Sequence, residues 1–463
     1  MDPRNPYSGS RVAVFGLARS GLSAARWLAA AGAEVLAWDD DAGRRAAIAS
    51  LPVRAVAPDP GGWAGIEALV LSPGVPLSHP QPHPVVALAR RLGARVIGDI
   101  EVFATAFPAA RVVGITGTNG KSTTTALIGH LLRAAGRPVA VGGNLGTPVL
   151  DLPGLPRNGT HVLELSSFQL DLTTSLKPAV AVWLNLTPDH LDRHGDLAGY
   201  VAAKRRLLDM APPEATLVIG IDDPASLAQV TALQAAGREV LPVAVGRAIE
   251  HGIHAIDGRL YRQETLLADL NGIRSLRGAH NWQNAAAAVA AGLALGLGRD
   301  ELRAGLPSFA GLPHRMEQVG LIDGIAFVND SKATNAEAAA RALASFGSIY
   351  WIAGGLPKTG GIGALTHYFP RVRQAFLIGQ AAPEFARTLA GRVRCQQSGD
   401  LATALHQAYA AARADGAPEP VVLLSPACAS FDQFANYEAR GDRFRELVAA
   451  MTGGPVSREA VRC

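Results

Sequence analysis

The stretch Gly114-Ile115-Thr116-Gly117-Thr118-Asn119-Gly120-Lys121-Ser122-Thr123 decides the fold of the middle of the chain. It follows an apolar, β-branched run expected to form a strand and precedes a helix expected over residues 122–135. A glycine-rich turn between a strand and a helix presents backbone N–H groups and the helix N-terminus to phosphate groups. In this pattern the Lys121 ammonium reaches the β- and γ-phosphates, and the Ser122 hydroxyl reaches Mg²⁺.

The stretch departs from the strict G-x4-G-K-S pattern at one position, because Ile115 stands where the first glycine is required. The alternative is a tight strand-to-helix turn with an incidental lysine. The position of the turn between a strand and a helix favours binding of a nucleoside triphosphate over this alternative. The expected ATP-binding residues in the turn are Gly117, Thr118, Asn119, Gly120, Lys121, Ser122 and Thr123.

The same alternation of strand, glycine-rich turn and alanine-rich helix recurs before and after this stretch, which predicts an α/β protein. Expected strands cover residues 12–15, 35–38, 68–71, 162–165, 180–185, 325–328, 349–353, 376–378 and 421–424. We predict three domains: a Rossmann-like domain over residues 1–104, a central P-loop ATPase domain with a parallel sheet over 105–312, and a Rossmann-like domain over 313–463. The Gly- and Pro-containing segment 306–313 is the expected linker before the third domain.

Composition excludes several classes of protein. The 463 residues suffice for about three domains, and 48% hydrophobic against 18% charged residues excludes a disordered chain. A net charge of +4 without long basic runs suits a small anionic ligand and gives no reason to expect nucleic acid. Three cysteines without a CxxC pair fit a reducing compartment, and the apolar stretch 285–298 is too short to cross a membrane. We therefore expect a cytoplasmic protein without membrane insertion.

In the first predicted domain, three turns follow strands. Gly16-Leu17-Ala18-Arg19-Ser20-Gly21 lacks the second glycine of a dinucleotide fingerprint, so a phosphate site and a simple packing turn remain equal alternatives. Asp39-Asp40-Asp41 follows the second strand, and Ser72-Pro73-Gly74 follows the third. On spacing alone the last is an ordinary Pro-Gly turn, although ligands of α/β sheets bind at this edge.

In the central domain, carboxylate and imidazole side chains lie near the ends of apolar strands or in the loops after them. Glu164 suits Mg²⁺, since hard cations prefer oxygen ligands, while Asp189 and His190 lie on a loop at the same edge. Lys204 lies in a basic helical segment, and composition alone favours a solvent-exposed helix face for it over a functional role. Asn281 and Asn284 open an alanine-rich helix at i, i+3, where capping explains one asparagine but not both.

Three polar loops follow strands of the third domain. They are Asn329-Asp330-Ser331-Lys332-Ala333-Thr334-Asn335, Gly354-Gly355-Leu356-Pro357-Lys358 and Ser425-Pro426-Ala427-Cys428-Ala429-Ser430-Phe431-Asp432. Each alone could be a loop with a helix cap. Three such loops in one sheet favour an anion site.

Taken in order, these segments resemble the Mur ligase family over nearly the whole chain. The phosphate loop is shared with folylpolyglutamate synthetases. The segments 330–335 and 425–430, together with Gly311-Leu312-Pro313-His314-Arg315, are more specific and look most like the members that add D-glutamate.

The resemblance implies the following roles. The residues expected to bind the UDP-linked substrate are Arg19, Ser20, Asp39, Ser72 and Asn144, and those that complete the ATP site are Asn281, Asn284, Arg315 and Asp330. Two Mg²⁺ ions are expected on Ser122, Glu164, His190 and a carbamylated Lys204. The implied catalytic residues are Lys121, His190, Lys204 and Lys332, with Thr334, Lys358, Ser430 and Tyr437 around the incoming amino acid.

By the same resemblance we expect ATP-dependent addition of D-glutamate to UDP-N-acetylmuramoyl-L-alanine through an acyl phosphate, by a monomer. Closure of the third domain would bring Arg315 and Asp330 to the nucleotide and exclude water. Two alternatives stay open. Another Mur ligase or a folylpolyglutamate synthetase would use different amino acids, and a regulatory or motor ATPase would hydrolyse ATP without any amino acid.

Overall fold

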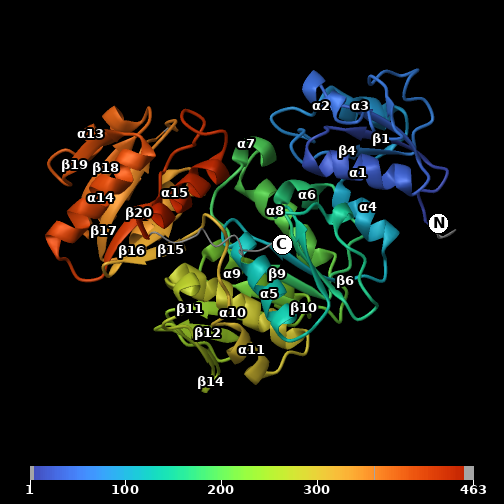
Figure 1. Cartoon of the computed structure of the whole chain (residues 1–463). Coiled ribbons are helices and arrows are strands. Elements are labelled where there is room, and N and C mark those ends of the chain that lie inside the picture. Colours follow the sequence, from blue (N-terminus) through green and yellow to red (C-terminus); the bar gives the residue numbers. More distant parts are fainter. Residues whose placement is uncertain (1–4, 359, 453–463) are drawn as a thin grey trace. The chain divides into compact units, whose positions relative to one another are not determined.

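The structure is a computed structural model that describes residues 5–358 and 360–452. It contains three sheets flanked by helices (Figure 1). The first sheet is parallel, with strand order β3-β2-β1-β4-β5. Its elements are β1 (Arg11–Phe15), α1 (Arg19–Ala30), β2 (Glu34–Trp38), α2 (Ala42–Ala46), β3 (Arg54–Ala55), β4 (Ala68–Leu71), α3 (Pro84–Arg91), β5 (Arg95–Ile97) and α4 (Asp99–Ala106).

The second sheet has the order β14-β13-β12-β11-β10-β9-β6-β8-β7. Its strands are β6 (Arg111–Thr116), β7 (Val139–Gly143), β8 (Thr160–Glu164), β9 (Val180–Trp183), β10 (Thr216–Gly220), β11 (Val240–Val245), β12 (Ile253–Ile256), β13 (Arg259–Arg262) and β14 (Thr265–Asp269). The helices are α5 (Lys121–Ala134), η1 (Val149–Asp151), α6 (Ser167–Asp171), α7 (Leu191–His194), α8 (Leu197–Asp209), α9 (Pro224–Ala235), η2 (Arg274–Leu276), α10 (Ala279–Ala294) and α11 (Arg299–Gly305). A parallel sheet was predicted for this domain. The prediction is wrong at one edge, because β13 and β14 extend the sheet as an antiparallel hairpin.

The third sheet has the order β15-β16-β20-β17-β18-β19 and is parallel except for its edge strand β15. Its strands are β15 (Glu317–Ile322), β16 (Ile325–Asn329), β17 (Ser348–Gly354), β18 (Val372–Ile378), β19 (Cys395–Gly399) and β20 (Pro420–Leu424). The helices are α12 (Ala336–Ala344), η3 (Gly363–Arg371), α13 (Ala382–Leu389), α14 (Leu401–Asp415) and α15 (Tyr437–Thr452). The three-domain α/β architecture is therefore confirmed.

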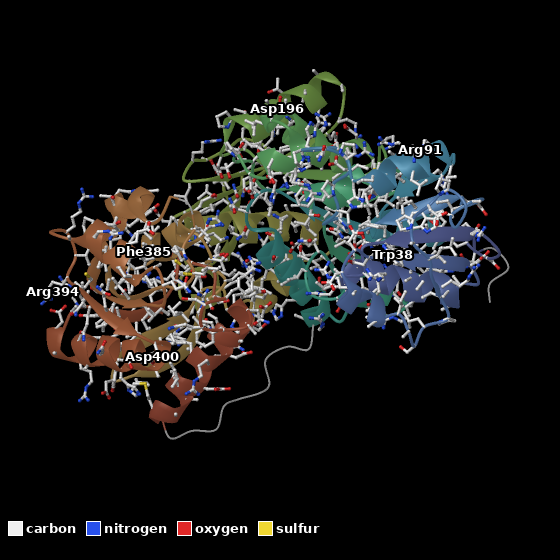
Figure 2. The ribbon with its side chains drawn as sticks, turned by 90° about the horizontal axis from the view of Figure 1, so that it is seen from above. Trp38, Arg91, Asp196, Phe385, Arg394 and Asp400 are labelled. Carbon is white, nitrogen blue, oxygen red and sulfur yellow. The ribbon has the colours of Figure 1, made fainter. Side chains whose placement is uncertain are left out.

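Central strands are buried on both faces, which explains their continuous apolar sequences. Every residue of β4, β9 and β17 is buried. On the third sheet, Phe385 of α13, labelled in Figure 2, is 1% exposed and belongs to the core on one face. Because helices cover both faces, binding groups are left to the loops that follow the strands.

By internal contacts the chain forms two compact units. The first contains the first two sheets and Trp282–Ser308, and the second contains Leu270–Asn281 and the third sheet. Within the first unit, the Glu101 carboxylate of α4 accepts hydrogen bonds from the N–H groups and hydroxyls of Thr174 and Ser175 at 2.6–2.9 Å. The domain limits at residues 104 and 312 stay predictions, and α4 runs across the first of them. Among the described helices, none is both long and apolar enough to cross a membrane.

Candidate active site

The phosphate loop lies between β6 and α5, as predicted. Gly117 and Gly120 have φ values of 146° and 85°, which L side chains rarely adopt, and a Cβ on Gly120 would collide with the Asn284 side chain. The Lys121 ammonium donates to the carbonyls of Gly117, at 2.9 Å, and Thr118, at 2.8 Å. The loop therefore has the backbone that a phosphate cradle needs, and its lysine lies against it.

A chain of hydrogen-bonded amide groups supports this loop. The Asn119 N–H donates to the Asn185 side-chain oxygen at 2.9 Å, and the Asn185 amide donates to Gln283 at 2.8 Å. Gln283 in turn donates to the Asp222 carboxylate at 2.9 Å. Sequence reasoning assigned no role to Asn185, Gln283 or Asp222, and only the strand-end position of Asn185 could have indicated one.

Lys204 lies on α8, contacts the phosphate loop and is 1% exposed. Its ammonium donates to the Gly117 carbonyl at 2.8 Å and lies 4.6 Å from the centre of the Tyr200 ring. Burial lowers the pKa of Lys204 well below its usual value, and the charge of Lys121 lowers it further, although Asp189 and Glu164 oppose the shift. The solvated helix face considered for Lys204 is therefore wrong, because the side chain is buried against the phosphate loop.

Glu164 ends β8 and is 3% exposed. One carboxylate oxygen accepts from the Asn144 amide at 2.8 Å, while the other, Oε2, is buried without a hydrogen-bond partner in the described part of the chain. An unpaired buried carboxylate oxygen is costly unless a cation or donor meets it. Together with the buried hydroxyl-bearing Ser122 at the start of α5, this hard oxygen fits a Mg²⁺ ion.

The second predicted metal ligand is less enclosed. His190 precedes α7 with φ 52°, is half-exposed, and has its ring nitrogen 3.5 Å from Asp189. The described residues hold no group of three or more His, Cys, Asp or Glu side chains arranged to bind a metal ion. A site on His190 would therefore need a ligand outside this set, such as the carbamate expected on Lys204.

A buried histidine that sequence reasoning missed supports His190. His194 bonds to the Ser167 hydroxyl at 2.9 Å and lies 3.4 Å from the Asp171 carboxylate. Burial lowers the pKa of His194 to about 4, aided by the nearby charges of His190 and Lys204. The Phe168 ring stacks on His194 and lies 5.0 Å from His190, which fixes the packing of this loop.

Asn281 and Asn284 are both buried near the start of α10. Asn284 accepts from the Thr124 hydroxyl of α5 at 3.3 Å and thus lies at the phosphate loop. Asn281 donates to the Arg277 carbonyl at 2.9 Å. The two asparagines serve different contacts, which agrees with the expectation that capping does not explain both.

A cavity of about 830 Å³ lies beside the first sheet. All five residues predicted for the UDP-linked substrate line it: Arg19, Ser20, Asp39, Ser72 and Asn144. Asn144 also contacts Glu164, so the cavity adjoins the candidate metal ligand. Arg44 and His83 line the cavity as well, and sequence reasoning missed both.

Two buried groups shape this cavity. Burial favours the protonated form of Asp39, but the N–H groups of Leu17 and Asp41 and the charge of Arg44 lower its pKa below the usual value. The Ser72 hydroxyl donates to the Gly16 carbonyl at 3.0 Å, so the Ser72-Pro73-Gly74 turn is part of the cavity wall.

One missed arginine joins this turn to the second sheet. Arg193 of α7 donates to the carbonyls of Pro73, Gly74 and Val75 at 3.1–3.3 Å. Its guanidinium also lies 4.4 Å from the centre of the Phe168 ring. The loop that carries His190 is thereby tied to the turn at the cavity.

In the second unit, Asp330 follows β16 and is buried. It accepts from the Ser425 hydroxyl at 2.8 Å and from the Met316 N–H at 3.2 Å. Burial raises the pKa of Asp330 to about 7, while these bonds and the charge of Arg315 oppose the shift. Residues from two of the three predicted polar loops therefore meet at Asp330, with Arg315 nearby.

Arg440 of α15 holds the same two loops together. It is 1% exposed and donates to the Ser331 hydroxyl and carbonyl at 2.9 Å. It also donates to the carbonyls of Cys428, at 3.1 Å, and Ala429, at 3.4 Å. Sequence reasoning missed Arg440, whose position in a charged helix gave no signal.

The predicted amino-acid-binding residues lie on these loops and at the start of α15. The Lys332 ammonium lies 3.8 Å from the centre of the Tyr437 ring. Ser430 is 2% exposed, Thr334 is half-buried, and Lys358 is exposed on the loop after β17. A Cβ on Gly355 would collide with the Ala429 carbonyl, so this loop and the Ser425–Ser430 loop approach closely.

Comparison with known proteins gives a consistent relationship. Residues 115–292 match the Mur ligase middle domain, and residues 314–428 match the glutamate ligase domain of Mur ligases. The chain is 52% identical to a UDP-N-acetylmuramoylalanine–D-glutamate ligase of Nitrobacter hamburgensis, covering 98% of this chain and 99% of that protein. It is 51% identical to a protein of the same name from a Caulobacter species, covering 99% and 100%.

Solved structures share the fold at low identity. The UDP-N-acetylmuramate–alanine ligase of Thermotoga maritima superposes with a TM-score of 0.56 at 17% identity, covering 96% of this chain and 99% of that one. A pseudomurein peptide ligase type C from Methanothermus fervidus gives a TM-score of 0.55 at 18% identity, covering 96% and 100%.

Proposed function

Because the chain belongs to the Mur ligase family, we propose that it is an ATP-dependent ligase that adds D-glutamate to UDP-N-acetylmuramoyl-L-alanine during peptidoglycan precursor synthesis. The observation that carries this proposal is the 52% and 51% identity, over nearly the whole chain, to proteins named for that reaction. The phosphate loop and the adjoining cavity of about 830 Å³ support it, since the substrates are a nucleoside triphosphate and a UDP-linked acid. We expect the protein to act in the cytoplasm, because ATP and the UDP-linked substrate are cytoplasmic. We also expect it to be a monomer.

The chemistry requires activation of a carboxylate, which is a poor electrophile. The alanine carboxylate attacks the γ-phosphorus of ATP, which gives an acyl phosphate and releases ADP. The amine of D-glutamate then attacks the acyl carbon, and phosphate leaves as the amide forms and the amine loses a proton. The protein has no covalent role in this sequence and acts by positioning anions and offsetting their charge.

In this proposal the phosphate loop and Lys121 bind the ATP phosphates, while Arg19, Ser20, Asp39 and Ser72 bind the UDP-linked substrate. The unpaired oxygen of Glu164 and the Ser122 hydroxyl would hold Mg²⁺, which when bound neutralises phosphate charge.

A second Mg²⁺ on His190, and the conversion of Lys204 to a carbamate, extend the proposal. A neutral buried lysine amine can add to CO₂ with loss of a proton, and the resulting anion attracts a cation that an ammonium would repel. The lowered pKa of Lys204 supports this step, because only the unprotonated amine is nucleophilic.

In the second unit, we propose that Lys332 and Lys358 bind the two carboxylates of D-glutamate. Thr334, Ser430 and Tyr437 would complete this site with hydroxyl groups. Asn281, Asn284, Arg315 and Asp330 complete the nucleotide site in the proposal.

The experiment is phosphate release from ATP and Mg²⁺ with UDP-N-acetylmuramoyl-L-alanine, measured without amino acid, with D-glutamate and with L-glutamate. We expect release that requires both substrates and the D-isomer. Release without any amino acid would favour a regulatory ATPase. Release that requires a folate or an L-amino acid would favour another member of the wider group.

A further inference from the structure

A second cavity, of about 590 Å³, lies in the first unit and has no part in the proposed reaction. It is formed where the segment after α4 enters β6, and its volume is within the range of cavities that enclose small organic molecules. The aromatic rings of Trp27, Phe103 and Phe107 line it. The Phe107 ring centre lies 5.8 Å from that of Trp27 and 5.3 Å from that of Phe103.

The charges around this cavity have one sign. Arg111, at the start of β6, and Arg157, before β8, line it, and no Asp or Glu does. Among the described residues, neither guanidinium has a carboxylate within ion-pair distance. An apolar chamber with two such cations favours a ligand that has a flat apolar body and one anionic group, and disfavours a cation.

We propose that this second cavity binds small aromatic anions, with the rings of Trp27, Phe103 and Phe107 around the apolar body and Arg111 and Arg157 on the anionic group. Each cation supplies a charge-assisted hydrogen bond, and the aromatic rings remove the flat body from water. A folded macromolecule could not place comparable area inside a chamber of this size, so the occupant is a small molecule.

The second cavity is connected to the substrate cavity through one short segment. Pro148 lines the substrate cavity, while the next residues, Val149 and Leu150 of η1, line the second cavity. The strand β8 also connects the two sites. His161 of this strand lines the second cavity, and Glu164 ends the same strand at the candidate metal site. An occupant should therefore alter binding of the UDP-linked substrate, a consequence that rests on the proposed function.

The test uses 8-anilinonaphthalene-1-sulfonate, which has a flat apolar body and one sulfonate, on the full-length chain. We expect saturable binding by fluorescence that weakens about tenfold in the Arg111→Gln/Arg157→Gln variant, as loss of charge-assisted hydrogen bonds predicts. N-phenyl-1-naphthylamine, which lacks the sulfonate, should bind both proteins equally. Arg91→Gln removes one exposed arginine elsewhere in the first unit; it is the control for an arginine outside the cavity and should leave sulfonate binding unchanged.

Equal sulfonate binding by the double variant and the Arg91→Gln control would overturn the proposal. Binding that weakens in Arg44→Gln but not in the double variant would also overturn it, because Arg44 lines the substrate cavity instead. For the connection, the bound dye should change the KM for UDP-N-acetylmuramoyl-L-alanine at least twofold in the parent and not in the double variant. An unchanged KM in an active enzyme would refute the connection, whereas an inactive enzyme with intact dye binding would instead count against the proposed function.

Discussion

Replacing Arg440 by methionine should loosen the two loops that carry most of the proposed D-glutamate site. The guanidinium is 1% exposed and donates to three backbone carbonyls and one hydroxyl, which belong to Ser331, Cys428 and Ala429. Methionine has a similar length but no donor, so the carbonyls would be left buried without partners. Burial lowers the pKa of Arg440 to about 10, because the charged guanidinium has lost hydration.

The size of the effect follows from those bonds. An unpaired buried carbonyl costs about 1–3 kcal/mol, and the removal of one side of a buried charged network costs about 3–5 kcal/mol. We therefore expect Arg440→Met to lower the free energy of unfolding by about 3–5 kcal/mol. The KM for D-glutamate should rise more than the KM for ATP, because the loops held by Arg440 carry Lys332, Thr334 and Ser430.

The assay is urea unfolding of the full chain, followed by steady-state phosphate release with each substrate varied. Arg443→Met is the matched control, because Arg443 lies on the same helix but is exposed and pairs only with Glu446 among the described ion pairs, at 3.1 Å. Surface pairs of this kind contribute about 0–1 kcal/mol. An Arg440→Met protein as stable as Arg443→Met, with an unchanged KM for D-glutamate, would refute the reasoning.

Three further predictions concern other sites. Burial raises the pKa of Asp330 to about 7, compared with about 4 in the unfolded chain. The stabilising contribution of Asp330 is therefore complete below about pH 4 and is lost as the pH rises through 7. In Asp330→Asn, the free energy of unfolding measured in urea should depend less on pH across this range. Gly120→Ala should weaken ATP binding at least tenfold in calorimetry, because its Cβ meets Asn284, whereas Gly136→Ala, with φ 70° and open space, should bind ATP normally. Arg315→Ala should slow D-glutamate-dependent phosphate release, and a rate equal to the parent's would contradict its place in the nucleotide site.

The sequence predicted the buried parallel strands well, because a strand covered on both faces needs a continuous apolar run. The strand expected over residues 68–71 is β4 with the same bounds, and that expected over 12–15 is β1 with one more residue. The hairpin β13–β14 and the edge strand β15 were not predicted, because half-exposed strands mix polar and apolar residues. Their pairing depends on the neighbouring strand instead of on their own pattern.

The candidate site was predicted where a residue ends a strand or directly follows one, since such residues meet at one edge of a parallel sheet. Glu164 and Asp330 are examples. Residues that act on a loop from another element were missed, and Gln283 and Arg440 show why. Their roles depend on which backbone group the tertiary fold places opposite them, and a helix sequence carries no record of that partner.

The contacts of the Gly117 carbonyl connect the phosphate loop to the proposed carbamate. This one oxygen accepts from Lys121 at 2.9 Å and from Lys204 at 2.8 Å, which brings two ammonium groups together in a buried place. Their repulsion adds to burial in lowering the pKa of Lys204, whereas Lys121 is only half-buried. Conversion of Lys204 to a carbamate would turn this repulsion into attraction and stabilise the positive charge of Lys121, the group proposed to bind the ATP phosphates. A ¹³C carbamate resonance after exposure to labelled bicarbonate, absent in Lys204→Gln, is therefore expected, and its absence from the parent protein would remove the basis for this coupling.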